Sequence, residues 1–458
     1  MRDKDTGSND AKANRAADPA DAYQRTEIRD GMRVTWHEPI AMEDGNVLRA
    51  DVYRPIEDGK YPVILTYGAF GKGVAFQEGY PMQWQKMVED FPEILEGSTN
   101  KYQSWEVTDP ERWIPHGYVC VRVDSRGAGW SPGFMQNMSP REIEDVYNCI
   151  EWAGTQDWSN GKVGMLGISY FARNQWRVAA KRPPHLAAII PWEGVTDPYR
   201  DSDYHGGILS EFQKLSSRVQ IARVQYGRGE LALRNPNTGE SEEELAATRS
   251  GAFDDLKANP LYTDFHRARA ADLASIEVPL LSCANWGGQG IHPRGSFNGY
   301  LDAGSRQKWL EVHGDSHWSV FYSAYGRDLQ RRFFDHFLKG EDNGWERGPK
   351  VMLNVRYPGE KFVYREENEW PLARTQWTRF YLDLDAQELT TEPPQEASQL
   401  SYATMGEGID FWLPPRDEDI EITGPIASKL FVSSKTSDAD LFLVVRLFTA
   451  DMREVCFK

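Results

Sequence analysis

Short apolar runs alternate with amphipathic segments along much of this chain, and this alternation restricts the fold more than any other feature. The runs are brief and rich in β-branched residues, as buried parallel strands are. The segments between them, such as "PREIEDVYNCIEWAG" and "RNQWRVAAKR", have helical spacing. The pattern predicts a doubly wound parallel α/β sheet with helices on both faces. The runs are "YPVILTYGAF", "GYVCVRVDSR", "KVGMLGIS", "HLAAIIPW", "VPLLSCANW" and "KWLEVHG".

Three parts of the chain lack this alternation. Residues 1–26 are polar and nearly devoid of large apolar groups, which predicts a disordered arm. Residues 194–275 contain charged helical patterns without a strand-like run, which predicts a helical cap between two core segments, 27–193 and 276–345. Residues 346–458 turn to alternating strands without helices, among them strands over residues 422–434 and 438–458, which predicts a β-rich C-terminal domain. Because this pattern runs to the last residue, we expect that domain to be incomplete.

Charge and cysteine content limit the partners. The chain has 52 Lys and Arg residues against 69 Asp and Glu residues, a formal net charge of -17. Such a protein repels nucleic acid and anionic membranes, so we expect neither as a partner. There is no export signal or membrane-spanning run, and the four cysteines are far apart, as reduced core residues would be. We therefore expect a soluble cytoplasmic protein without cofactor or metal.

The segment "GMLGISYFA", residues 164–172, contains a candidate nucleophile, Ser169. A glycine two residues before a serine, at the end of an apolar run, is what a strained strand-to-helix elbow requires. Phe171 replaces the second glycine of the G-x-S-x-G pattern, so the triplet by itself is weak evidence. A serine hydroxyl also needs a base to take its proton, which calls for a histidine late in the chain.

Three histidines follow the later strand-like runs. The carboxyl ends of parallel strands meet at one edge of a sheet, so these residues are candidates to meet Ser169. His317 in "HGDSHWSVF" comes after the last run and is the best placed general base. His313, at the end of that run, is its competitor, and His292 is a weaker third.

The segment "GKVGMLGISYFARNQW" resembles the nucleophile segment of the cocaine esterase and X-prolyl dipeptidyl-peptidase (CocE/NonD) group of α/β-hydrolases. Other blocks are similar in the same order, including "MEDGNVLRADVYRP", "CIEWAGTQDWSNGKVG" and "EITGPIASKLFVSS". The likeness spans residues 32–458. It implies a serine hydrolase with an α/β-hydrolase core, a helical cap and a C-terminal jelly-roll domain, of which this chain has only part.

Carried over by position, the resemblance assigns the nucleophile to Ser169 and the general base to His317. It implies that the backbone N–H of Tyr170 forms one side of the oxyanion hole. The family's second donor is a tyrosine hydroxyl, and Phe70 stands in its place. We expect a backbone N–H of Phe70 or Gly71, or the hydroxyl of Tyr67, to substitute, or the enzyme to be slow.

The catalytic acid is a second departure from the family. Gly288 stands where the resemblance implies an aspartate. The imidazolium still needs a carboxylate to fix its tautomer and stabilise its charge. Glu193, after "IIPW", is the preferred acid because it follows a neighbouring strand-like run, and Asp315, two residues before His317, is the alternative.

Residues near the expected strand ends are candidates to contact a substrate. Asp197, Asp201 and Asp203 could bind a substrate ammonium, although such a run is more often a solvated face. Aromatic residues could line an acyl pocket, although most aromatics are core. They are Trp192, Trp286, Trp318 and Tyr199.

These features predict a serine hydrolase that cleaves an ester or amide, acyl, aminoacyl or peptidyl, through an acyl-enzyme on Ser169. The alternative is a weak or inactive hydrolase-fold binding protein, which Phe70 and Gly288 would explain. The sequence does not choose between an esterase and an X-Pro dipeptidyl-peptidase. It identifies neither the small-molecule or short-peptide substrate nor the oligomeric state, and a homo-oligomer stays open.

Overall fold

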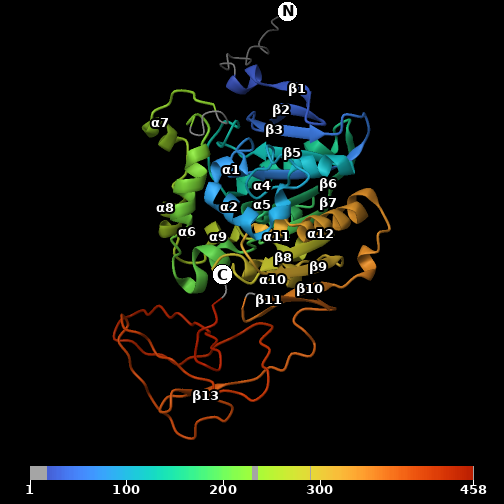
Figure 1. Ribbon diagram of the computed structural model, residues 1–458. Helices are drawn as coiled ribbons and strands as arrows, with labels where there is room; N and C mark the ends of the chain where they lie inside the picture. Colours follow the sequence, from blue (N-terminus) through green and yellow to red (C-terminus); the bar gives the residue numbers. More distant parts are fainter. Residues whose placement is uncertain (1–17, 230–235, 289, 360, 457–458) are drawn as a thin grey trace, which may run out of the picture. The chain divides into compact units, whose positions relative to one another are not determined.

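The computed structural model describes residues 18–229, 236–288, 290–359 and 361–456 (Figure 1). The chain divides into two compact units, one ending at Met352 and the other beginning at Leu353. The candidate site lies wholly in the first unit.

A twisted sheet forms the centre of the first unit. The strands β1, β2, β3 and β5 pair antiparallel, and from β5 through β4, β6, β7 and β8 to β9 every pairing is parallel. β4 and β5 are buried almost throughout, as their continuous apolar sequences predict. The order across the sheet is β1 (Arg25–Arg29), β2 (Met32–Ala41), β3 (Val47–Arg54), β5 (Val119–Asp124), β4 (Tyr61–Gly68), β6 (Ser159–Ile168), β7 (Leu186–Trp192), β8 (Leu280–Asn285) and β9 (Lys308–His313).

The sheet divides the apolar core of the unit into two clusters. Neighbouring residues of one strand point to opposite faces, so Met165 joins one cluster and Leu166 the other. Helices α4 (Pro140–Gly154) and α5 (Tyr170–Ala179) cover the Met165 face, and α11 (Ser319–Tyr322) and α12 (Ala324–Phe334) cover the Leu166 face (Figure 1). The remaining helices before and after the cap are α1 (Phe76–Gly79), α2 (Pro81–Asp90), α3 (Pro110–Trp113) and α10 (Pro293–Asp302).

Residues 194–275 form the insertion drawn mostly in green in Figure 1. Their described part contains short helices and turns and no strand. Ser241 caps α7 by accepting the N–H of Glu244, while the Glu244 carboxylate accepts the N–H of Ser241. The helices are α6 (Phe212–Ser216), α7 (Glu242–Ala247), α8 (Ala252–Ala258) and α9 (Asp264–Arg267). In the described ranges of the chain, no helix is both long and apolar enough to cross a membrane.

The N-terminal segment differs from the disordered arm that the sequence predicts for residues 1–26. Residues 1–17 lie outside the described part of the chain, but the turn Pro19–Ala22 and β1 follow at once. The buried guanidinium of Arg49 donates to the carboxylates of Asp18 and Asp21, at 2.6 Å each. These ion pairs order the segment, and no local sequence pattern reveals a partner located on β3.

The second unit has few regular strands. It contains β11 (Lys361–Glu367), β12 (Tyr381–Asp383) and β13 (Glu388–Thr390), and β10 (Val351–Tyr357) leads into it. The sequence predicts strands over residues 422–434 and 438–458, but the described residues there form no ladder beyond the isolated bridge between Phe448 and Glu454. Phe431 and Val444 are 92% and 75% exposed. An apolar alternating sequence becomes a strand only where another strand pairs with it.

Candidate active site

Ser169 occupies a strained turn between β6 and α5. Its φ of 55° and ψ of -106° lie outside the regions that most residues adopt. The Ser169 N–H donates to the carbonyl of Trp192 at 3.0 Å, which ties the turn to the end of β7. A Cβ on Gly167 would lie 2.5 Å from the Cβ of Phe171, so only glycine fits before the turn. The predicted elbow is therefore present, and the second glycine of the pattern is not needed.

The hydroxyl of Ser169 meets a histidine. Its Oγ lies 3.0 Å from Nε2 of His292, which stands between β8 and α10. The described residues contain no hydrogen bond between Ser169 and His317. The structure therefore brings the weakest of the three sequence candidates to the nucleophile.

A single buried carboxylate connects the histidines. Glu193 follows β7 with a φ of 51° and is fully buried. Its Oε2 accepts Nδ1–H of His317 at 2.7 Å and lies 3.6 Å from Nδ1 of His292, an ion-pair distance. Its Oε1 accepts Nε2–H of His313 at 3.2 Å. Burial would raise the pKa of Glu193, but the charge of His317 and the histidine hydrogen bonds hold that pKa well below its usual 4.5.

His317 lies between two carboxylates. Its Nε2 donates to Oε1 of Glu106 at 3.1 Å, opposite the Glu193 contact. Burial opposes the charge, but Glu193 and Glu106 raise the pKa of His317 to about 10. Burial lowers the pKa of His292 and is offset only in part by Glu193. The two rings stack with centroids 4.9 Å apart and planes 4° from parallel. The pKa is therefore raised for one imidazole and lowered for the other, although the two rings are neighbours.

The other candidates for base and acid are His313 and Asp315. His313 is buried behind Glu193, and its Nδ1 donates to Glu311 at 2.7 Å. The carbonyl oxygen of Asp315 accepts the side-chain N–H of Asn285 at 3.1 Å. Of the two acids that the sequence proposes, Glu193 makes the contact with Nδ1 of His317.

Tyr170, Phe70 and Tyr67 are the candidates for the oxyanion hole. Tyr170 is the first residue of α5, where a backbone N–H has no intrahelical acceptor, and its hydroxyl donates to Glu142. The ring of Phe70 packs edge-on against the rings of Tyr170 and Phe171, with centroids 5.4 and 5.8 Å apart. The hydroxyl of Tyr67 accepts the N–H of Arg126 at 3.2 Å. The predicted backbone role of Tyr170 thus does not involve its side chain.

The predicted pocket residues do not form one wall. Trp192 is fully buried and packs on His313, with ring centroids 5.0 Å apart. Tyr199 lies in the insertion, where its hydroxyl donates to the carbonyl of Pro260 at 2.9 Å. Trp286 packs on Phe297, with ring centroids 5.7 Å apart. Trp318 packs on His317, with ring centroids 5.5 Å apart.

The three aspartates of the insertion are engaged in local contacts. Asp201 is buried, accepts the N–H groups of Thr196 and Asp197, and pairs with Arg294. Asp203 is buried and accepts hydrogen bonds from Ser202 and Gln213 at 3.0 Å each. Asp197 pairs with Arg200 at 2.5 Å. The carboxylates of all three aspartates therefore have partners within the protein, and these residues do not form a solvated face.

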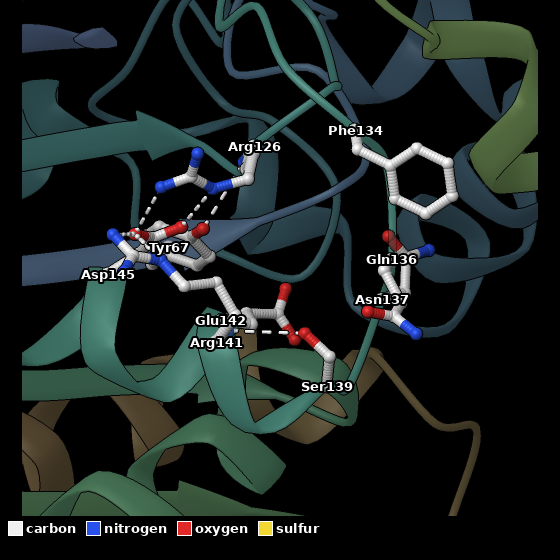
Figure 2. A pocket seen from close by; sticks show the side chains of 9 residues that line it. All are labelled: Tyr67, Arg126, Phe134, Gln136, Asn137, Ser139, Arg141, Glu142 and Asp145. Carbon is white, nitrogen blue, oxygen red and sulfur yellow. Dashed lines mark hydrogen bonds and ion pairs between the residues drawn. The ribbon is translucent and has the colours of Figure 1, made fainter. Parts of the chain in front are cut away.

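A separate cavity of about 250 Å³ lies beside α4 (Figure 2). Figure 2 shows the guanidinium of Arg126 facing the carboxylate of Asp145, with two contacts of 2.8 Å. The lining includes neither Ser169 nor Glu193. The cavity is therefore lined by other residues than the candidate nucleophile and acid.

Glu193, His292 and His317 also have the composition of a metal site. Their ligand atoms lie within 4.8 Å of one another, and this is the set that could hold an ion among the residues described. Two imidazoles and a carboxylate are common ligands of zinc and iron. The sequence predicts no metal, and the contact of His292 with Ser169 gives the same groups an acid-base use.

The parallel sheet with a strained serine and a buried acid-histidine cluster at its carboxyl edge defines a serine-type α/β-hydrolase. Residues 44–319 match the family model of the X-Pro dipeptidyl-peptidases (S15 family). Residues 343–456 match the C-terminal non-catalytic domain of X-Pro dipeptidyl-peptidases. The chain belongs to this family of serine hydrolases, so the predictions of family, fold and enzyme class are confirmed.

Relatives of known name span both activities of the family. The chain is similar to the cocaine esterase of Rhodococcus sp. strain MB1 Bresler, with 24% identity over 91% of this chain and 79% of the relative. It is 25% identical to the Xaa-Pro dipeptidyl-peptidase of Streptococcus pneumoniae over 41% of this chain and 30% of that protein. A solved CocE/NonD family hydrolase from Staphylococcus aureus is 35% identical, with a TM-score of 0.68. That match covers 79% of this chain and 60% of the solved one.

The sequence does not predict Glu106 as a site residue, and it ranks His292 last of the three candidate bases. Glu106 lies in "QSWEVTDP", which has no strand pattern, and its φ of 61° cannot be read from sequence. His292 precedes Pro293, a residue typical of the first turn of a helix, and follows the Gly-rich segment after "VPLLSCANW". That position at a strand-to-helix connection was the available signal for His292.

Proposed function

We propose that this protein hydrolyses an ester or amide through a covalent acyl-enzyme on Ser169. The contact of 3.0 Å between Oγ of Ser169 and Nε2 of His292, at a strained elbow, carries the proposal. A hydroxyl becomes a useful nucleophile when an imidazole accepts its proton. In this proposal the backbone N–H of Tyr170, at the first position of α5, donates to the oxygen that becomes negative, and the carboxylate of Glu193 supports the positive charge on the histidines.

Fluorophosphonate labelling tests the nucleophile. The wild-type chain should be labelled at Ser169, and heat-denatured protein and Ser169→Ala should not. p-Nitrophenyl acetate should give a burst of p-nitrophenol, close to one equivalent per active site, that Ser169→Ala lacks. Labelling that persists in Ser169→Ala contradicts the proposal.

The second candidate, a weak or inactive binding protein, rests on Phe70. Phenylalanine has no hydroxyl, so position 70 has no side-chain donor for an oxyanion. Its ring packs against the rings of Tyr170 and Phe171. Loss of one oxyanion donor reduces turnover by about a hundred- to a thousand-fold. A folded wild-type protein that gives no burst and no labelling would favour this candidate.

The substrate class stays within the two activities named among the relatives. We propose small esters, as for cocaine esterase, and X-Pro dipeptide amides, as for Xaa-Pro dipeptidyl-peptidase, as the two classes to compare. Turnover of p-nitrophenyl esters and of X-Pro p-nitroanilides should be measured on the same preparation. A large ratio of kcat/KM between the two assigns the class.

A further inference from the structure

Three imidazoles share the carboxylate of Glu193, and within the described residues His292 is the one that contacts the nucleophile. We propose that His292 is the catalytic residue that takes the proton of Ser169, and that His317 is a positioning residue held between Glu193 and Glu106. This inference rests on the proposed function and assigns roles within the same site. It differs from the sequence prediction, which gives the base role to His317.

The hydrogen bonds of the two rings set their roles. Both nitrogens of His317 face carboxylates, at 2.7 Å to Glu193 and 3.1 Å to Glu106. A ring that donates from both nitrogens has no lone pair left to accept a proton. His292 has Nε2 at the Ser169 hydroxyl and Nδ1 toward Glu193. With its proton on Nδ1, His292 presents an acceptor to the nucleophile.

The charges around the rings favour the same assignment. His292 faces two groups, Glu193 at the end of β7 and the ring of His317. The buried carboxylate of Asp201, which is paired with Arg294, also acts electrostatically on His292. Burial and the neighbouring cation keep the pKa of His292 below its ordinary 6.5, so this ring is neutral at pH 7. His317 faces Glu193, Glu106 and His292, and its pKa of about 10 keeps it charged at that pH. A general base must begin the reaction unprotonated.

The proton is returned in each half of the reaction. Oγ of Ser169 bonds to the carbonyl carbon while its proton passes to Nε2 of His292. The bond to the leaving group breaks, and the same nitrogen donates that proton to the leaving alcohol or amine. A water molecule then attacks the acyl carbon and gives its proton to Nε2. The acid product leaves as Oγ regains a proton, so Ser169 and His292 end as they began.

The pH dependence of acylation in the wild-type protein tests the assignment without a mutation. The second-order rate of fluorophosphonate labelling reports the base of the free enzyme. We expect the rate to rise with pH, reach half of its maximum below pH 6.5, and stay level from pH 7 to 9. A rate still rising above pH 9, with a midpoint near 10, would assign the base to His317 and overturn the inference.

Two matched variants give an independent readout. His292→Gln should slow labelling of Ser169 by about a thousand-fold, the range of general-base catalysis. His317→Gln should keep the rate within about tenfold and move the midpoint upward, because it removes the cation beside His292. The reverse ranking would overturn the inference. Should His292→Gln fail to fold by circular dichroism, the wild-type profile and the His317→Gln shift still decide.

The same measurements separate the inference from the proposed function. Wild-type labelling at Ser169 with a midpoint near pH 10 contradicts only the roles of the two histidines. Absence of labelling at Ser169 in folded wild-type protein contradicts the proposed function, and the inference with it.

Discussion

Oε2 of Glu193 lies 2.7 Å from Nδ1 of His317, although 124 positions separate the two residues in the chain. The contact joins the carboxyl end of β7 to the loop after β9. The same oxygen is 3.6 Å from Nδ1 of His292, and the other oxygen of Glu193 accepts from His313. One carboxylate therefore sets the charge of three imidazoles.

Replacing Glu193 should stop turnover while keeping the fold. In Glu193→Gln the isosteric amide removes the negative charge that supports the imidazolium. We expect kcat for a p-nitrophenyl ester to fall by about a thousand-fold or more, with an unchanged far-ultraviolet circular dichroism spectrum. Asp315→Asn is the matched control and should stay near wild type. Near-normal turnover of Glu193→Gln together with loss in Asp315→Asn would transfer the role of acid to Asp315.

A carboxylate at position 288 should restore part of the kcat that Glu193→Gln loses. A Cβ on Gly288 would lie 3.4 Å from Oε2 of Glu193 and 3.6 Å from Nδ1 of His292. In Glu193→Gln/Gly288→Asp the new carboxylate faces the same imidazole, and we expect kcat to recover at least about tenfold over Glu193→Gln. Gly288→Asp alone should lower the unfolding temperature, because two carboxylates would then repel each other at close range. No recovery in the double variant would contradict this geometry.

The free energy of unfolding should fall in alkaline solution. Folding raises the pKa of His317 from about 6.5 to about 10. A group with a raised folded-state pKa stabilises the protein fully below the unfolded value, and that stability is lost as pH rises toward 10. The pKa of His313 is raised to about 9 and acts in the same direction. We expect the unfolding free energy to fall by on the order of 7 kcal/mol from pH 6.5 to 10.

Urea titrations at fixed pH measure this loss. His317→Gln removes one of the two groups, so its free energy of unfolding should vary less steeply over the same pH range. His336→Gln, which changes a half-buried histidine outside the cluster, is the control and should keep the wild-type slope. Equal slopes for wild type and His317→Gln would exclude His317 as the source.

The hydroxyl of Tyr170 should matter for stability and not for catalysis. It donates to the buried carboxylate of Glu142, whose pKa is raised by burial. Tyr170→Phe removes this donor and should lower the free energy of unfolding by about 1–3 kcal/mol. The backbone N–H at position 170 remains, so the burst with p-nitrophenyl acetate should keep its amplitude and stay within a few-fold of its wild-type rate. A hundred-fold slower burst would show that the side chain itself acts in the reaction.

The strands of the parallel sheet and the elbow could be predicted because they depend on local patterns. Three of the apolar runs became β4, β5 and β6, which end at Gly68, Asp124 and Ile168. The strands predicted over residues 422–434 and 438–458 are not formed in the described chain, because pairing requires a second strand that local alternation does not specify.

The site was predictable only in part for the same reason. Ser169 and Glu193 follow strand ends, a position that sequence can identify. Which histidine meets Ser169 depends on where the loop containing His292 turns, and no periodicity fixes that turn. Glu106 comes from an irregular segment with left-handed backbone, so its approach to His317 is set by tertiary packing alone.

The ion pairs of Arg49 also affect where the chain can be shortened. The composition of residues 1–26 suggests a tail that can be cut away, yet Asp18 and Asp21 neutralise a guanidinium that is only 2% exposed. Removing the partners of a buried charge destabilises a protein by about 3–5 kcal/mol, more than removing an exposed arm would. A cut before Asp18 keeps both carboxylates that pair with Arg49. A cut at residue 26 leaves the buried Arg49 of β3 without these two counter-charges and exposes the edge of the sheet that β1 covers.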